Sequence, residues 1–156
     1  MRRLGMLAVL AAVAACAHYG WDGTQELSRS MPAPADSLVY AAARALRAHG
    51  YEPRIVNGQL LVTMPHAVPQ YTRPVSTNPE MDGDTWVIQV QAEPNTLRAG
   101  STLKVAAFIV PKAAATASGD SVRQRQAIPV DARRPDLMRE VQRVGDWIVE
   151  ESDGKH

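Results

Sequence analysis

Histidines, a single cysteine and one carboxylate cluster are the residues of this chain whose types could support catalysis or metal binding. No two of the four histidines stand at the spacing of paired metal ligands. Glu80, Asp82 and Asp84 alternate beside Gly83, which could hold calcium weakly, but the remaining oxygens and the terminal glutamate of a full calcium loop are missing. We therefore expect a solvated turn there and neither a metal nor a cofactor. The histidines are His18, His49, His66 and His156.

Nucleophilic and phosphate-binding motifs are also missing from the sequence. It contains no Gly-x-Ser-x-Gly elbow and no glycine-rich phosphate loop. Serine, aspartate and histidine residues occur, but nowhere at a spacing that suggests a hydrolase. We therefore expect a protein that is not an enzyme, and a hydrolase ranks third among the hypotheses.

The N-terminus has the organisation of a secretory signal peptide. Arg2 and Arg3 form a short basic segment, and the twelve residues 4–15 (LGMLAVLAAVAA) are apolar and uncharged. This run is shorter than the roughly 20 residues that a membrane-spanning helix needs. The segment is therefore expected to be cleaved rather than to remain as a span.

Cys16, the only cysteine, directly follows this apolar run. The sequence Val13-Ala14-Ala15-Cys16 resembles the lipobox of bacterial lipoproteins. The resemblance implies diacylglycerol on the Cys16 thiol, cleavage before Cys16, acylation of the new amino group, and hence a membrane anchor. Ala17, in place of an aspartate, favours the outer membrane on its periplasmic side. The alternative is an ordinary secretory signal cleaved after Ala17.

Composition and charge indicate one globular domain behind this leader. Residues 1–15 are interpreted as the signal peptide, 16–35 as the lipidated cysteine and a flexible tether rich in Gly, Ser and Pro, and 36–152 as a single domain. The 17 basic and 16 acidic residues nearly cancel, so no charge excess draws the protein to nucleic acid. We expect a membrane and an envelope protein as partners, and no nucleic acid.

The first elements of the domain are a helix and a hairpin. Apolar residues at helical spacing predict a helix capped by Asp36 and ended by Gly50. Asn57-Gly58 is typical of a two-residue type I′ turn between two strands. That turn places Ile55 opposite Leu60, so that Leu60 and Val62 face the same way and Leu61 faces the other.

A second strand pair and a closing helix follow. Strands over 84–93 and 101–110, joined by 95–100, share an apolar face when Val90 lies opposite Val105. Trp86 then lies between sheet and helices, and the two-sided apolarity of 101–110 predicts a central strand. A polar strand is expected over 121–128 and a helix from Pro135 onward. Together these elements predict an α+β, two-layer sandwich with an antiparallel sheet of about five strands and two helices on one face.

Two surfaces are candidates for binding. Polar residues on the sheet face away from the helices form a candidate partner surface, although a simply hydrated face fits the same pattern. The proline-rich loop over 65–83 could instead close over a small ligand or peptide through Tyr71 and Arg73. The first surface predicts a non-enzymatic interaction or assembly module, and the second a periplasmic binding protein. The partner surface comprises Gln89, Gln91, Lys104, Phe108, Arg123 and Arg125.

Overall fold

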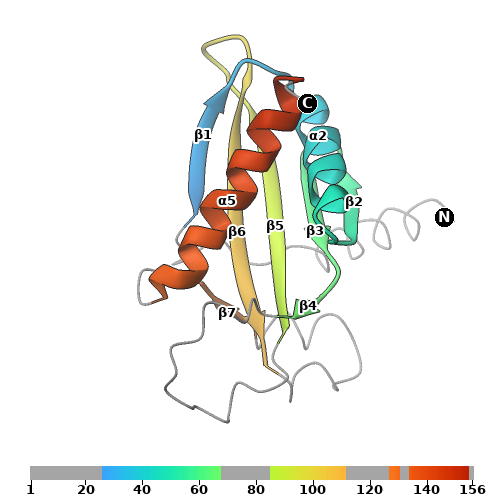
Figure 1. Ribbon diagram of the computed structural model, residues 1–156. Coiled ribbons are helices and arrows are strands. Elements are labelled where there is room, and N and C mark those ends of the chain that lie inside the picture. Colours follow the sequence, from blue (N-terminus) through green and yellow to red (C-terminus); the bar gives the residue numbers. More distant parts are fainter. Residues whose placement is uncertain (1–25, 68–84, 112–126, 131–133, 155–156) are drawn as a thin grey trace, which may run out of the picture.

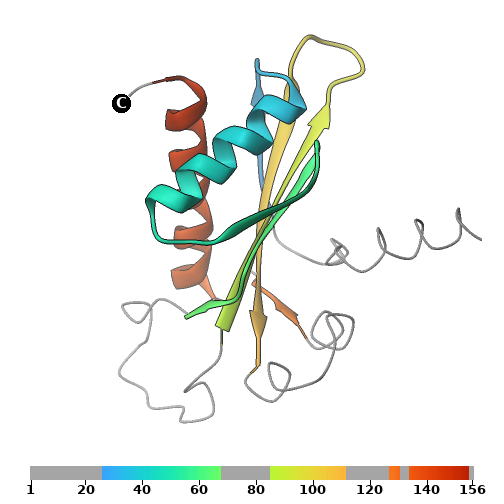
Figure 2. The same cartoon turned by 90° about the vertical axis from the view of Figure 1, so that its right-hand side faces the viewer.

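The computed structural model describes residues 26–67, 85–111, 127–130 and 134–154. Within these residues, two helices and an antiparallel sheet of seven strands are present. Figures 1 and 2 show both helices on one face of the sheet, so the predicted two-layer α+β sandwich is confirmed. The main path of the sheet has five strands, as many as predicted, but one of them, Leu27–Met31, is not among the predicted strands. Two short strands extend this path.

The sheet order is β1-β6-β5-β3-β2, with β4 paired to β5 and β7 paired to β6. All of these pairs are antiparallel. The elements are β1 (Leu27–Met31), α2 (Ala35–Ala48), β2 (Pro53–Asn57), β3 (Leu60–Thr63), β4 (His66–Ala67), β5 (Thr85–Pro94), β6 (Ser101–Val110), β7 (Ile128–Pro129) and α5 (Pro135–Ser152).

Strand β1 corrects the predicted tether, because Leu27–Met31 is part of the sheet. Helix α5 passes close above this strand. A Cβ atom at Gly145 of α5 would lie 2.1 Å from the end of the Leu27 side chain, so any other residue there would require that side chain to move. Arg29 also reaches α5, with its guanidinium 2.6 Å from the Asp146 carboxylate. These contacts come from a distant part of the chain, and five residues of local sequence do not reveal them.

Helix α2 ends as predicted but begins differently. Its N-cap is Pro34, and Asp36 lies in the first turn, where its Oδ1 accepts the Ser37 N–H at 2.8 Å. At the other end Gly50 has a φ of 83°, and Tyr51 N–H donates to the Leu46 carbonyl at 3.0 Å. This is the Schellman arrangement, in which a left-handed residue satisfies the last helical carbonyls.

The turn between β2 and β3 lies one residue later than predicted. Asn57 pairs with Leu60 across the turn, and a bulge between Ile55 and Asn57 places Ile55 opposite Leu61. Neither Asn57 nor Gly58 has the positive φ of a type I′ turn, because the Asn57 Oδ1 instead accepts the Gln59 N–H at 2.8 Å. The one-residue shift exchanges the faces of β3, so Leu61 is buried in the core beneath the helices.

Strands β5 and β6 form the centre of the sheet in the predicted register. Val90 lies opposite Val105, and residues 95–100 connect the strands. Gly100 has a φ of 107° and lies so close to β1 that a Cβ there would be 2.2 Å from the Met31 carbonyl oxygen. Strand β6 is flanked by β5 on one side and by β1 and β7 on the other, which confirms its predicted central position.

The main core lies between the sheet and the two helices. Trp86 is fully buried there, as predicted, although no hydrogen-bond acceptor among the described residues meets its Nε1. The helices contact each other through His49 and Trp147, whose stacked rings have centroids 3.6 Å apart. The buried aliphatic residues of α5 are Leu137, Val141, Val144 and Ile148.

Helix α5 begins at Pro135, as predicted, with an ion pair at its first turn. Burial by itself raises the pKa of Asp136. Hydrogen bonds from Arg134 and from the Leu137 backbone, together with the positive charge of Arg134, lower the pKa by more than burial raises it. The pKa of Asp136 therefore lies below its ordinary value. Asp136 therefore stays ionised at the positive end of the helix.

Candidate functional site

The outer face of the sheet, which points away from the helices, contains most of the predicted partner surface. At the end of the face where β5 begins and β6 ends, its outward side chains are apolar. Val87 and Val110 are buried there and form a second small cluster with Val62 and Ala127. This end of the outer face is a second core region rather than a hydrated surface.

Two of the predicted partner residues belong to this buried end. Gln89 has no exposed surface and Phe108 is 3% exposed, so the prediction that both side chains are available to a partner is wrong. The reason was visible in the sequence, because β6 is apolar at its outward positions Ala106, Phe108 and Val110 as well as at its inward ones. A strand that is apolar on both faces is expected to be covered on both.

The opposite end of the outer face is polar and half-exposed. We call this set, Gln91, Glu93, Thr102 and Lys104, the polar strip. Gln91 lies opposite Lys104 and Glu93 opposite Thr102, so the four side chains form two adjacent cross-strand pairs. In strand β1 the exposed Ser28 and Ser30 lie beside Lys104 and Thr102 and extend the strip to the sheet edge.

Hydrogen bonds and ion pairs order the polar strip. Gln91 Nε2 donates to Glu93 Oε1 at 3.0 Å, and Lys104 Nζ lies 3.2 Å from the same carboxylate. Lys104 Nζ also lies 3.7 Å from Glu26 Oε1, so one ammonium group is shared by two carboxylates. The Oε1 atom of Gln91 is buried and meets no donor among the described residues. The acceptors that the strip presents to solvent are therefore carboxylate oxygens, which favour a partner that presents N–H donors.

The remaining predicted site residues lie outside the described residues. These are the lipidated Cys16, the ligand-loop residues Tyr71 and Arg73, and Arg123 and Arg125 of the polar strand. Of the expected 65–83 loop, the structure describes only residues 65–67, and His66–Ala67 form the short strand β4.

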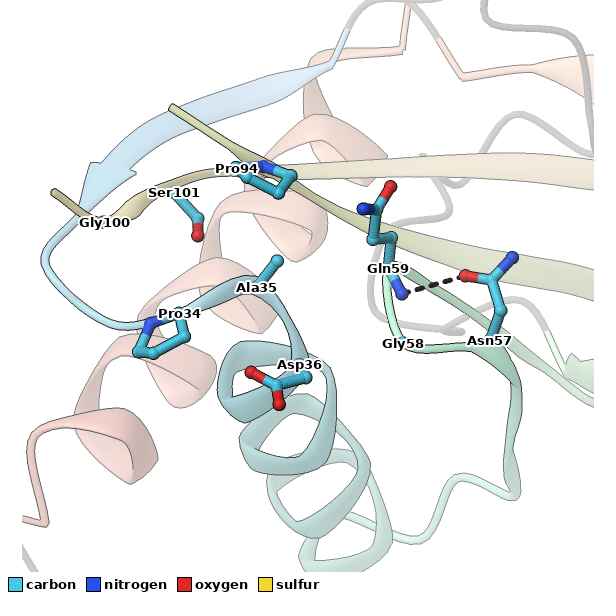
Figure 3. A pocket seen from close by; sticks show the side chains of 9 residues that line it. All are labelled: Pro34, Ala35, Asp36, Asn57, Gly58, Gln59, Pro94, Gly100 and Ser101. Carbon is cyan, nitrogen blue, oxygen red and sulfur yellow. Dashed lines mark hydrogen bonds between the residues drawn. The ribbon is translucent and has the colours of Figure 1, made fainter. Parts of the chain in front are cut away.

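A pocket that the sequence analysis did not predict lies at the N-terminus of α2 (Figure 3). It is an open depression of about 710 Å³ where the start of α2, the β2–β3 turn and the β5–β6 connection meet. A possible sequence signal was the set of turn residues at Asn57-Gly58 and at Pro94 and Gly100, but only the fold places them at one end of the sheet. The lining residues are Pro34, Ala35, Asp36, Asn57, Gly58, Gln59, Pro94, Gly100 and Ser101.

The pocket is lined by both apolar and polar groups and carries one negative charge. Among the described residues, Asp36 is its only acidic lining residue, and no basic side chain lines it. Ser101 is fully buried, and its Oγ has no hydrogen-bond partner within the same ranges. Figure 3 shows that this hydroxyl points toward the first turn of α2, where Pro34 and Ala35 lie. Because Asp36 already serves the helix N-terminus, the pocket suits a neutral polar molecule better than an anion.

No group of three or more His, Cys, Asp or Glu side chains in the described ranges lies close enough to hold a metal ion. Among the same residues, neither helix is long and apolar enough to cross a membrane. No protein-family model matches the chain, and no curated protein is significantly similar to it.

Proposed function

We propose that this protein is a bacterial envelope lipoprotein, anchored through Cys16 to the outer membrane, and that its domain is a non-enzymatic module that binds another envelope protein. The lipobox-like sequence before Cys16 supports the anchor. The proposed binding surface is the polar strip, continued by Ser28 and Ser30 at the edge of the sheet.

One observation carries the binding proposal. The outer face is covered at its apolar end, yet at the other end it leaves a row of half-exposed hydrogen-bonding side chains on three adjacent strands. The carboxylates of Glu26 and Glu93 share the one positive charge of Lys104, so the strip carries a local excess of negative charge. This excess favours a partner segment that carries N–H donors or positive charge. Interfaces of this polar kind derive specificity from complementary charge and hydrogen bonds.

The anchor and the binding surface are tested separately in cells. Cys16→Ser should abolish labelling with palmitate and release the domain from the membrane fraction. Normal labelling or unchanged membrane association in that variant contradicts the anchor.

For the surface, a photo-crosslinking amino acid at Thr102 should capture a partner that the same group at the exposed Tyr40 of α2 does not capture. Lys104→Gln should alter the yield of that adduct, whereas Arg47→Gln, an exposed charge on α2, should not. Equal capture from Thr102 and Tyr40, or equal effects of the two charge removals, contradicts the polar strip as the binding site.

A second candidate function is supported by the pocket at the start of α2. Its buried Ser101 hydroxyl, unpartnered among the described residues, together with the carboxamides of Asn57 and Gln59, suits a small neutral ligand with hydroxyl or amide groups. This is the ligand-binding alternative from the sequence, with the pocket at the start of α2 as the site in place of the 65–83 loop.

Gly58 provides a direct test of the pocket. A Cβ at Gly58 would meet its nearest atom, the Asp36 Cβ, at 4.0 Å, so Gly58→Leu should fold normally and fill the pocket. Glucose and N-acetylglucosamine are suitable neutral probes. They should shift amide resonances of Gly58 and Ser101 in the wild type, and these shifts should disappear in Gly58→Leu. Identical spectra of the wild type with and without the probes contradict a site for such molecules.

A further inference from the structure

The two edges of the sheet differ in how they are protected against pairing with another strand. Edge strand β2 has three protective features: Pro53 lacks an N–H, Arg54 places an exposed charge on the edge, and a bulge interrupts the strand between Ile55 and Asn57. Natural sheets use each of these features to prevent edge-to-edge pairing. Strand β2 is therefore a poor template for an added strand.

Edge strand β1 has none of these features. It pairs with β6 over five residues without a register shift and contains no proline. Its one charge, on Arg29, is directed to the helix side and bound to Asp146, while Ser28 and Ser30 are small, uncharged and exposed. Among the described residues β6 is the only strand paired with β1, and Figure 1 shows β1 as the outermost strand on its side. One row of its backbone N–H and C=O groups is therefore not paired with any strand of the described ranges and can accept a further strand.

The sequence of β1 is nearly symmetric about Arg29. Leu27 and Met31 are both apolar and face the helices, whereas Ser28 and Ser30 both face outward. An antiparallel strand with the same sequence, centred on Arg29, therefore places serine opposite serine and Leu27 opposite Met31. We propose that β1 pairs with β1 of a second copy of this chain and joins two sheets across a two-fold axis.

The charges at this edge are also self-complementary. Two Arg29 side chains lie opposite each other in the proposed pair, and two like charges alone oppose pairing. Each arginine, however, is bound to an Asp146 carboxylate whose side chain is 55% exposed. The two-fold axis thus brings together two guanidinium groups and two carboxylates, and each carboxylate retains acceptor positions for the arginine of the second copy.

A pair of five-residue strands is a small interface, so attachment to a membrane is expected to increase the fraction of the protein that is dimeric. The chain from Cys16 to the start of β1 is short, and two copies held on one bilayer meet at a raised effective concentration. This last step rests on the proposed lipidation, whereas the geometry of β1 does not. The test below therefore includes a readout for the anchor.

The experiment uses the full chain, expressed in bacteria in two versions with different epitope tags. The double variant Ser28→Cys, Ser30→Cys places a cysteine opposite a cysteine of the second copy, at a Cα separation of about 4.5–5.5 Å. This separation lies within the range for a disulfide. Mild oxidation of the membranes should give a species of twice the chain mass that carries both tags.

A matched control is available on the protected edge. Glu52 and Arg54 are exposed and two residues apart, as Ser28 and Ser30 are, so Glu52→Cys, Arg54→Cys should give at most about a tenth of the dimer yield. The only cysteine of the wild type is Cys16, so oxidation of the wild type measures any dimer that is linked through Cys16. Palmitate labelling of every variant measures whether the anchor is attached. Three outcomes with palmitate-labelled protein contradict the pairing of β1 with itself. The cysteine variant of β1 gives no dimer, it gives the same dimer yield as the cysteine variant of the β2 edge, or it forms adducts only with other proteins.

A charge variant tests the same pairing without crosslinking. Ser28→Asp, Ser30→Asp places carboxylates opposite carboxylates of the second copy, whereas within one chain the carboxylate introduced at position 28 lies beside Lys104, which is favourable. In sedimentation of the detergent-solubilised protein, the dissociation constant of the dimer should rise about tenfold or more while the melting temperature stays near that of the wild type. A monomeric wild type, or an unchanged dimer in this variant, overturns the proposal.

Discussion

Side chains of the central strands β5 and β6 point alternately to the inner and the outer face of the sheet, but the two faces are covered to different extents. The inner face packs against α2 and α5 along its whole length, with Trp86, Ile88 and Val90 fully buried. The outer face is buried at one end, at Gln89 and Phe108, and half-exposed at the other. Alternation therefore indicates which side chains share a face, but it does not indicate which parts of that face are covered.

The largest expected effect tests the inner face. Trp86→Ala removes the largest fully buried side chain and should lower the free energy of unfolding by about 3–5 kcal/mol. Trp86→Phe keeps most of the apolar volume and removes an indole N–H that meets no acceptor among the described residues, so its cost should be far smaller. Urea unfolding of both variants measures this. Similar midpoints for the two variants would show that Trp86 is not in a packed core.

The next effect tests whether the apolar end of the outer face is truly a core. Phe108→Ala should cost about 3 kcal/mol, since burial of Phe108 is nearly complete. A hydrated outer face predicts almost no effect at this position. Unfolding by urea distinguishes the two, and a change below about 0.5 kcal/mol would restore the original prediction that Phe108 is exposed.

Two glutamines on the outer face of one strand sharpen the comparison between its ends. Gln89 is fully buried, so Gln89→Ala should cost about 1–3 kcal/mol as its hydrogen-bonding groups and packing are lost. Gln91→Ala, two residues along the same strand, should change stability by no more than about 0.5 kcal/mol because Gln91 is half-exposed. Equal melting temperatures for the two variants would contradict the division of the outer face.

A further small effect concerns the ion pairs of the polar strip. Lys104→Met keeps the aliphatic stem and removes the charge shared by Glu26 and Glu93, which should cost at most about 1 kcal/mol. The difference between Lys104→Met and wild type should shrink as the salt concentration rises, because partly exposed pairs are screened. A salt-independent difference would mean that packing, rather than charge, is what Lys104 contributes.

Several features of the fold follow from local sequence alone. Gly50 ends α2 because only a residue tolerant of positive φ closes the helix in this way, and Pro135 begins α5 because its missing N–H is not needed at that position. The Val90–Val105 register follows from matching two apolar stripes across a connection of defined length. In each case the physical cause lies within a few residues or in a strict repeat.

The β2–β3 turn shows where local sequence is insufficient. Asn57-Gly58 is compatible with a type I′ turn, yet the Asn57 side chain binds the Gln59 N–H, and a bulge at Val56 moves the turn by one residue. That choice is decided by the core, which gains Leu61 under the helices. The energetic difference between the two registers lies in tertiary burial and not in the turn itself.

The sequence by itself determined the order of the main elements, the inner face of strands β5 and β6 and the lipobox-like segment at Cys16, because each depends on a repeat or on adjacent residues. Only the tertiary structure decided that Leu27–Met31 is an edge strand, that the polar Gln89 is buried, and that the start of α2 forms a pocket with Ser101. These features arise from contacts between distant segments, such as Gly145 against Leu27 and Gly100 against Met31. No local periodicity encodes them, because each part of the contact is an ordinary stretch of sequence until the fold brings the two together.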